Sequence, residues 1–200
     1  AGGVTIHSFF QLPFGNFIPR PFQNFEAHGF KVNDPVSLIK ELQIRDRKRT
    51  LIRQLELLII DEVSMLRADI IDAMDVVLRH IRKKTNIPFG GVQVLFIGDM
   101  HQLPPVVKEN EWRLLKNYYD SMYFFDSHVL KNNPPIYIEL EKIYRQHDPV
   151  FISMLNNVRD GEITQRDVEL LNQHYIPGYE AKSDDRTITI TTHNRKADEI

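Results

Sequence analysis

The sequence contains no cysteine among its 200 residues. Without thiols the chain has neither a disulfide framework nor a thiolate metal site, which excludes zinc fingers and fits a reducing compartment. It also lacks any apolar run near the roughly 20 residues that span a bilayer, and its first residues, AGGVTIHSFF, lack the basic flank and cleavage site of a signal peptide. We therefore expect no membrane partner and no secretion, with a cytosolic location, such as the bacterial cytoplasm, or an organellar one.

A large excess of charge of either sign is absent as well. The 25 Lys and Arg residues nearly balance the 27 Asp and Glu residues, so the net charge is −2. The total charge gives no indication of a nucleic-acid partner, and any such partner must be bound by local patches. The basic run IRDRKRTLIR, residues 44–53, is one candidate for tracking phosphates, although such a run is more often a solvated helix face.

Apolar and β-branched runs alternate with helical stretches along the chain. The expected strands cover residues 4–6, 57–60, 92–98, 136–140 and 187–192. Two of them are almost continuously apolar, as are strands buried on both faces of a parallel sheet. Residues 68–84 place apolar side chains at helical spacing, with the charges on the opposite face. This alternation predicts an α/β fold with a parallel sheet.

Two further helices carry their own start signals. Asp148 before Pro149 predicts an N-cap and a first-turn proline, and Gly161 predicts the end of that helix. Thr164 with Asp167 resembles the capping box of the next helix. Both signals place helices in the last third of the chain.

Polar side chains follow two of the expected strands. Asp61 and Glu62 follow one, and Asp99 and Gln102 follow the next. Ligands bind outside the carboxyl ends of parallel strands, so these side chains share one crevice if the strands are neighbours. An apolar strand that delivers Asp and then Glu suits nucleotide hydrolysis, in which the first acid helps to hold Mg²⁺ and the second accepts a proton from the attacking water. A solvated strand end and a metal-dependent nuclease, which also uses clustered acids, are the alternatives.

Several segments resemble the motifs of one enzyme family. LLIIDEVSML, residues 57–66, looks like a Walker B segment, and IGDMHQLPPV, residues 97–106, looks like the motif that follows it in the PIF-type DNA helicases, the superfamily-one group that also contains the RecD proteins. VTIHSFF near the start and LEKIYRQ, residues 140–146, match two more segments in the right order. TITITTHNRKADEI at the end is similar to the early part of the family's second RecA-like domain.

The resemblance implies a RecA-like P-loop NTPase motor fold. It implies a first motor domain over residues 1–140 with a small irregular insert at about 10–35, and the beginning of a second over 141–200, with KNNPP, 131–135, as the candidate joint. Family members carry a glycine-rich Walker A loop upstream of the position where this chain begins, and no GxxxxGK(S/T) pattern occurs in it. We therefore expect an internal fragment that does not turn over ATP by itself.

The resemblance also implies the activity. Its members suggest an ATP-dependent 5′-to-3′ DNA helicase that uses ATP and Mg²⁺ to move along single-stranded DNA and to open DNA forks. A monomeric motor is expected. For the isolated chain, a non-catalytic DNA-binding module is the alternative.

Five residues match positions of the family's ATPase site. The match implies that Asp61 is a Mg²⁺ ligand through water and that Glu62 polarises the hydrolytic water. Gln102 would sense the γ-phosphate, and Asp99 would organise its loop. Arg145 would act on the γ-phosphate as an arginine finger, with a surface ion pair as the alternative.

Four residues match positions that lie beside the single strand in the family: His7, Ser8 and Phe9 of IHSFF, and Asn194 of THN. A hydroxyl and an imidazole bind phosphate oxygens, and an aromatic ring stacks on a base. Taken without the resemblance, His7 is more often a core or loop histidine.

Phenylalanine and proline are concentrated in residues 9–30, which hold seven of the 12 phenylalanines and three of the 11 prolines. No helical or alternating period runs through this stretch, so we expect no regular strand or helix there. By resemblance to the family's insert, it lies at the DNA fork, with Phe14, Phe17 or Phe22 as candidates for base stacking. The alternative is a loop that packs only on its own domain.

Overall fold

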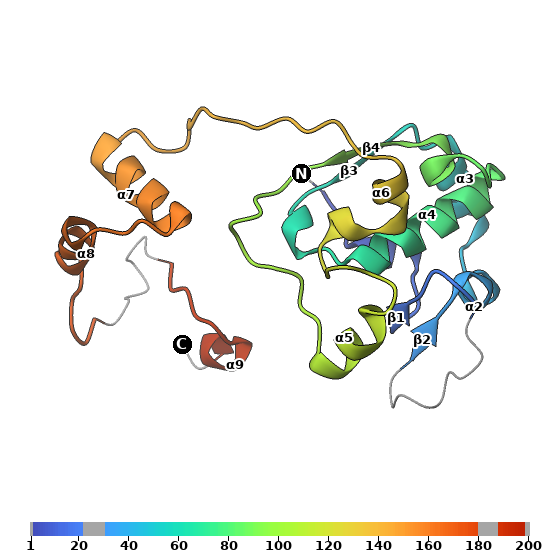
Figure 1. Cartoon of the computed structure of the whole chain (residues 1–200), viewed down its shortest axis with the longest axis horizontal. Helices are drawn as coiled ribbons and strands as arrows, with labels where there is room; N and C mark the ends of the chain where they lie inside the picture. The colour runs from blue at the N-terminus through green and yellow to red at the C-terminus, as the bar shows by residue number, and fades with distance from the viewer. Residues whose placement is uncertain (1, 22–30, 180–187, 199–200) are drawn as a thin grey trace. The chain divides into compact units, whose positions relative to one another are not determined.

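The computed structural model describes residues 2–21, 31–179 and 188–198 (Figure 1). The chain divides into two compact units, Ala1–Glu139 and Leu140–Ile200. This division falls next to the expected domain boundary. The assignment of the two units to two motor domains stays a prediction.

A parallel sheet of two strands forms one layer of the first unit. β3 (Leu57–Ile60) pairs with β4 (Gln93–Phe96), which confirms the strands expected at 57–60 and within 92–98. Alternate side chains of both strands join the main core: Leu58, Ile60, Val94 and Phe96. The other face is 44–54% exposed at Leu57, Ile59, Leu95 and Ile97. Burial on both faces is therefore not seen among the described residues.

α4 (Ala68–Arg82) runs through the core of this unit and confirms the helix expected at 68–84. Its apolar face is fully buried, with Ile71, Met74, Val77 and Leu78 at 0% exposure. The expectation that its charges all lie opposite is wrong. Three aspartates of the helix are buried too: Asp69, Asp72 and Asp75.

Each buried aspartate of α4 accepts backbone N–H groups from a segment far along the chain. Asp69 accepts the N–H of Phe17 at 3.0 Å, and Asp75 accepts that of Phe89 at 2.6 Å. Asp72 accepts the first two N–H groups of α6 (His128–Asn132), each at 3.0 Å. Desolvation nevertheless raises the pKa of Asp72. These bonds compensate for burying a carboxylate and attach three separate segments to one helix.

Among the described residues before the β3–β4 sheet, there are three helices and two short strands. They are α1 (Ile6–Phe10), β1 (Asn16–Phe17), β2 (Val32–Asn33), α2 (Pro35–Glu41) and α3 (Asp46–Gln54). The strand expected at 4–6 is wrong, because Thr5 caps α1 by accepting the N–H of Ser8 at 3.3 Å. β1 and β2 pair in parallel. The phenylalanine-rich stretch therefore contains regular structure, contrary to expectation.

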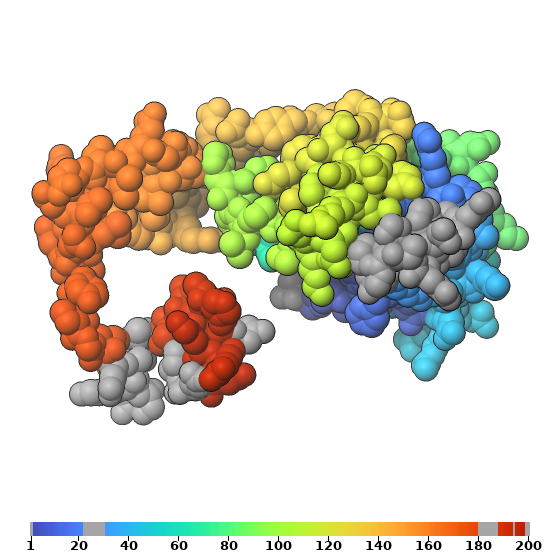
Figure 2. All heavy atoms as spheres, turned by 60° about the horizontal axis from the view of Figure 1, so that its bottom comes forward, coloured from blue at the N-terminus to red at the C-terminus, as the bar shows by residue number. Residues whose placement is uncertain are grey.

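Short helical segments complete the first unit: η1 (Val63–Met65), η2 (Pro88–Gly91), α5 (Glu109–Leu115) and η3 (Phe124–Asp126). Figure 2 shows α5 and the segment after it, in yellow-green, forming much of the visible surface of this unit. Leu114 and Leu115 of α5 pack with Ile18 and Val32 in a second core cluster. α5 is therefore fixed against the β1–β2 region.

The second unit contains α7 (Pro149–Asp160), α8 (Gln165–Asn172) and α9 (Asn194–Asp198). Three sequence signals are confirmed: the cap at Asp148, the helix end at Gly161, which has φ 74°, and the capping box of Thr164 with Asp167. Hydrogen bonds from Thr164 and Asn157 lower the pKa of Asp167.

The strands expected at 136–140 and 187–192 are wrong as far as the structure describes them. Residues 136–140 are exposed coil, residues 188–192 form no strand, and residue 187 lies outside the described residues. A β-branched run needs a neighbouring strand to pair with, and these runs have none within the described ranges. No helix in the part of the chain that the structure describes is long and apolar enough to cross a membrane.

Candidate active site

The pairing of β3 with β4 brings the two polar segments of the sequence to one edge of the sheet. The register runs from Leu57 opposite Gln93 to Ile60 opposite Phe96. Pairing continues past the strands, where Ile97 donates its N–H to Ile60 at 2.8 Å and accepts that of Val63 at 3.0 Å. The segment that begins at Asp61 therefore lies beside the segment that begins at Gly98.

Gly98 allows these two segments to approach closely. A Cβ at this position would lie 2.9 Å from Val63 Cγ1 and 3.0 Å from the Val63 nitrogen. The first distance is shorter than real Cβ contacts, and the second, to the backbone, is at the tight limit of them. A larger residue at position 98 would therefore push the Asp61–Glu62 turn away from the segment that carries Asp99.

The Asp61–Glu62 turn holds two exposed carboxylates on a strained backbone. Glu62 has φ 53° and ψ 43°, the left-handed region, which costs a non-glycine residue roughly 1–2 kcal/mol. Asp61 Oδ1 accepts the Glu62 N–H at 2.9 Å, and the Glu62 carbonyl accepts the N–H of Met65 at 3.2 Å. Within the described part, neither carboxylate forms an ion pair. Both remain available to a ligand.

Asp99 organises the neighbouring segment through three hydrogen bonds. Its Oδ1 accepts the N–H of His101 at 3.0 Å, and its Oδ2 accepts from Gln102 Nε2 at 3.2 Å. Its carbonyl accepts the N–H of Gln102 at 3.1 Å. Asp99 therefore binds both the backbone and the side chain of Gln102, and its role in organising this loop stays a prediction.

The carboxylates present suit a Mg²⁺ ion that Asp61 would hold through a bound water. Mg²⁺ keeps several waters and is usually bound by one or two carboxylates and by substrate phosphates. One oxygen of Asp61 is used by the Glu62 N–H, which leaves the other for a metal-bound water. No group of three or more metal-ligating side chains occurs among the described residues. The phosphate-binding loop that would complete the site is not in the sequence.

Arg145 lies in the second unit, on the segment before α7, and is exposed. The surface ion pair considered as its alternative role is not formed with any described residue. Its predicted contact with the γ-phosphate stays a prediction.

Two of the three predicted DNA-binding residues of α1 are exposed. His7 and Ser8 are exposed, while Phe9 is half-buried and packs edge-on against Phe10 with ring centroids 4.9 Å apart. Burial first, and then the Arg67 guanidinium, lower the pKa of His7, and Asp69 opposes this shift. His7 is therefore a neutral hydrogen-bonding group at pH 7.

Lys48 of α3 was not singled out by sequence reasoning, although it lies within the basic run 44–53. Its Nζ donates to the Ser8 carbonyl and lies 5.6 Å from the centroid of the Phe9 ring. The run is therefore not only a solvated face, since this lysine packs on α1.

The fourth predicted DNA-binding residue, Asn194, is the first residue of α9 in the second unit.

The candidate stacking phenylalanines differ in exposure. Phe17 is 2% exposed and belongs to the main core, so its assignment to DNA stacking is wrong. Phe14 is 86% exposed. Phe22 lies outside the described residues.

Comparison with known proteins identifies the family. Residues 26–169 match the family model of the PIF1-like helicases. The chain belongs to the PIF1-like helicase family. It is 35% identical over 179 residues to the ATP-dependent DNA helicase PIF1 of Saccharomyces cerevisiae. The matched region covers 86% of this chain and 18% of the yeast protein.

Solved Pif1 structures show the same fold. One is a crystal structure of Pif1 helicase from Bacteroides in complex with ADP-AlF3 and ssDNA, with 37% sequence identity and a TM-score of 0.83. The match covers 98% of this chain and 42% of the Bacteroides chain. Another is a structure of two coordinating Pif1 helicases at forked dsDNA, with 37% sequence identity and a TM-score of 0.78. This match covers 99% of this chain and 42% of the Pif1 chain in that structure. The predicted RecA-like α/β fold is confirmed. The chain spans less than half of these relatives.

Proposed function

We propose that these residues are part of an ATP-dependent 5′-to-3′ DNA helicase and supply the acidic half of its ATPase site. One observation carries the proposal: the β3–β4 register and Gly98 hold the Asp61–Glu62 turn against the segment of Asp99 and Gln102. Membership of the PIF1-like family supports it. So does the Bacteroides Pif1 complex with ADP-AlF3 and ssDNA.

In this proposal each polar residue has one chemical role. Asp61 holds a water of the Mg²⁺ shell, and Mg²⁺ when bound neutralises phosphate charge. Glu62 orients the attacking water and accepts its proton, for which its exposed carboxylate is free. Gln102, fixed by Asp99, hydrogen-bonds the γ-phosphate. Arg145 supplies positive charge to that phosphate.

Single-stranded DNA and DNA forks are the proposed partners. His7 and Ser8 hydrogen-bond phosphate oxygens, Phe9 stacks on a base, and Asn194 contacts the strand from the second unit. The structure of two Pif1 helicases at forked dsDNA supports the fork as substrate. For this chain a monomeric motor remains our expectation.

Strand-displacement assays test this proposal. They need a protein that carries these residues together with a glycine-rich phosphate-binding loop. With ATP and Mg²⁺ it is expected to open a duplex with a 5′ single-stranded tail and not one with a 3′ tail. Displaced strands of full length support a helicase, whereas shortened products without ATP would indicate the nuclease instead. Residues 1–200 alone, which contain no such loop, are the control and are expected to turn over no ATP.

A further inference from the structure

Arg67 follows η1, the short helix after the candidate catalytic turn, and is mostly enclosed. It lies between η1 and α4, five residues after Glu62, and its side chain is 16% exposed. Its guanidinium binds both oxygens of Asp69, through Nε at 2.8 Å and a terminal nitrogen at 2.6 Å. The Asp69 side chain is only 1% exposed. Such a two-point pair fixes the plane of the guanidinium.

The same two side chains reach β1. A terminal nitrogen of Arg67 donates to Asn16 Oδ1, and the Phe17 N–H donates to Asp69 Oδ2 at 3.0 Å. Asn16 is 0% exposed, so the bond lies inside the molecule. β1, which follows α1 in the chain, is therefore attached to Arg67.

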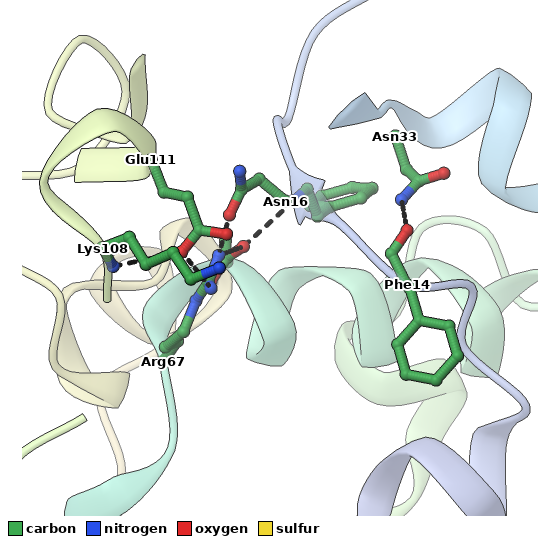
Figure 3. Close-up of polar contacts among 8 residues, drawn as sticks. Phe14, Asn16, Asn33, Arg67, Lys108 and Glu111 are labelled. Atoms are coloured by element: carbon green, nitrogen blue, oxygen red, sulfur yellow. Dashed lines mark hydrogen bonds and ion pairs between the residues drawn. The ribbon is translucent and has the colours of Figure 1, made fainter. Parts of the chain in front are cut away.

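A third connection from Arg67 runs to α5. The other terminal nitrogen of Arg67 lies 3.6 Å from Glu111 Oε2. The same Glu111 oxygen accepts the N–H of Lys108 at 3.1 Å, which caps α5. Lys108 ends the segment that begins at Gly98 and carries Gln102. Figure 3 shows Arg67 between Asn16 on one side and Glu111 with Lys108 on the other.

The electrostatic effect of Arg67 extends to α1. After burial, Arg67 is the next cause that lowers the pKa of His7, and Asp69 acts in the opposite direction. The Arg67 guanidinium thus acts both on α1, which carries the predicted DNA-binding residues, and on α5, which follows the segment of the predicted nucleotide-binding residue Gln102.

We propose that Arg67 is a positioning residue that connects the end of η1, which follows the Asp61–Glu62 turn, to β1 and to α5 at the end of the Gln102 segment. The inference rests on the proposed function. Lysine in its place keeps the charge but cannot bind Asp69 at two points and reach Asn16 and Glu111 together. Loss of Arg67 is therefore expected to misplace Gln102 relative to Glu62, with DNA stimulation of the reaction reduced as well.

Arg79, which lies within α4, provides a matched control. Arg79 binds both oxygens of buried Asp75 through Nε at 2.8 and 2.7 Å, and Asp75 also accepts a backbone N–H, from Phe89. This pair lies on the same helix but contacts neither β1 nor α5 in the described part. R79K therefore keeps the charge, removes the guanidinium contacts with a buried aspartate, and leaves the proposed connection untouched.

The experiment compares R67K, E111Q and R79K in a protein that also carries a glycine-rich phosphate-binding loop. We measure thermal unfolding, kcat and KM for ATP, and the stimulation of hydrolysis by oligo-dT. R67K is expected to lower kcat about 10-fold or more and to reduce the DNA stimulation, because small misplacements of reacting groups are costly. E111Q is expected to change both in the same direction by less. R79K is expected to lower the melting temperature without lowering kcat.

Three outcomes separate the possibilities. An unchanged kcat in R67K, or an equal loss in R67K and R79K, would overturn the positioning role and leave Arg67 as a stabilising residue only. If R67K does not fold, E111Q provides the test, because Glu111 links Arg67 to the Gln102 segment. An unchanged kcat and unchanged DNA stimulation in E111Q would then also overturn the positioning role of Arg67. Absence of DNA-stimulated hydrolysis in the unsubstituted protein would instead overturn the proposed function.

Discussion

At the scale of single residues, Glu62 combines backbone strain with an exposed carboxylate that forms no ion pair with any described residue. Its left-handed conformation is held by the Asp61 carboxylate and by the turn of η1. Strain of this kind, of order 1–3 kcal/mol, persists where the surrounding structure fixes it, and it is concentrated at functional sites. Glycine would relieve the strain but supply no proton acceptor. A glutamate at this strained position is therefore consistent with its proposed role as proton acceptor.

His7 gives a residue-scale prediction that depends on pH. Its pKa lies below the ordinary value because of burial and Arg67, so it is neutral at pH 7. A DNA phosphate beside the ring favours the protonated form and raises this pKa. Binding then takes up a proton, so affinity for single-stranded DNA is expected to strengthen as the pH falls through the pKa of the bound state.

Fluorescence anisotropy of labelled oligo-dT at a series of pH values measures this effect with residues 1–200. His7→Gln is expected to flatten the pH dependence, since it keeps a hydrogen-bonding side chain that does not titrate. An identical pH dependence in this variant would show that DNA does not contact His7.

At the scale of elements, the backbone around β1 gives Phe14 and Phe17 different environments, although the sequence does not distinguish them. Gly15, with φ 116°, forms the turn before β1, where a Cβ would lie 2.4 Å from the Lys31 carbonyl oxygen. Asn33 Nδ2 donates to the Phe14 carbonyl at 3.1 Å, which fixes the turn from the β2 side. Figure 3 shows this bond between Asn33 and Phe14. Phe14 is exposed while Phe17 lies in the core.

Alanine at these two positions is expected to give opposite results. Phe17→Ala should lower the free energy of unfolding by about 3–5 kcal/mol, because it leaves a cavity in the core. Phe14→Ala should change it by less than about 0.5 kcal/mol and should weaken DNA binding by roughly 1–3 kcal/mol if the ring stacks on a base. Urea unfolding and oligonucleotide binding measure the two quantities. Unchanged DNA binding in Phe14→Ala would show that the ring does not stack.

Sequence patterns correctly predicted the helices and strands that depend on nearby residues, either through their periodicity or through a capping side chain. The strand at 57–60, the helix at 68–84 and the caps at Asp148 and Thr164 depend on periodicity and on side chains within three residues, so the sequence shows them directly. The runs at 4–6 and 136–140 were misread because apolar content alone does not supply a pairing partner.

The candidate site was only partly predictable, for the same physical reason. Asp61, Glu62, Asp99 and Gln102 follow strands and are visible as motifs. Arg67 has no local signal, because its partners Asn16 and Glu111 are separated from it by 51 and 44 positions in the sequence. The three aspartates of α4 were placed in solvent because periodicity cannot show the distant N–H groups that permit their burial.

At the scale of the whole molecule, the proposed site residues are divided between two compact units. The first unit carries the carboxylates, Gln102 and the α1 residues, and the second carries Arg145 and Asn194. No glycine-rich phosphate-binding loop occurs in this sequence, so the proposed activity requires a protein that carries such a loop as well. The proposed function depends above all on Glu62 as the proton acceptor of this acidic half-site.

Glu62→Gln is the decisive substitution, measured as ATP affinity and turnover in a protein that also carries the phosphate-binding loop. The amide keeps the shape of the side chain and removes proton acceptance. Turnover is expected to fall by about 10² or more while Mg²⁺-dependent ATP binding is retained. An equal loss of binding and turnover would make Glu62 a metal ligand, and unchanged turnover would remove it from the chemistry. Either result would contradict the role of Glu62 as proton acceptor.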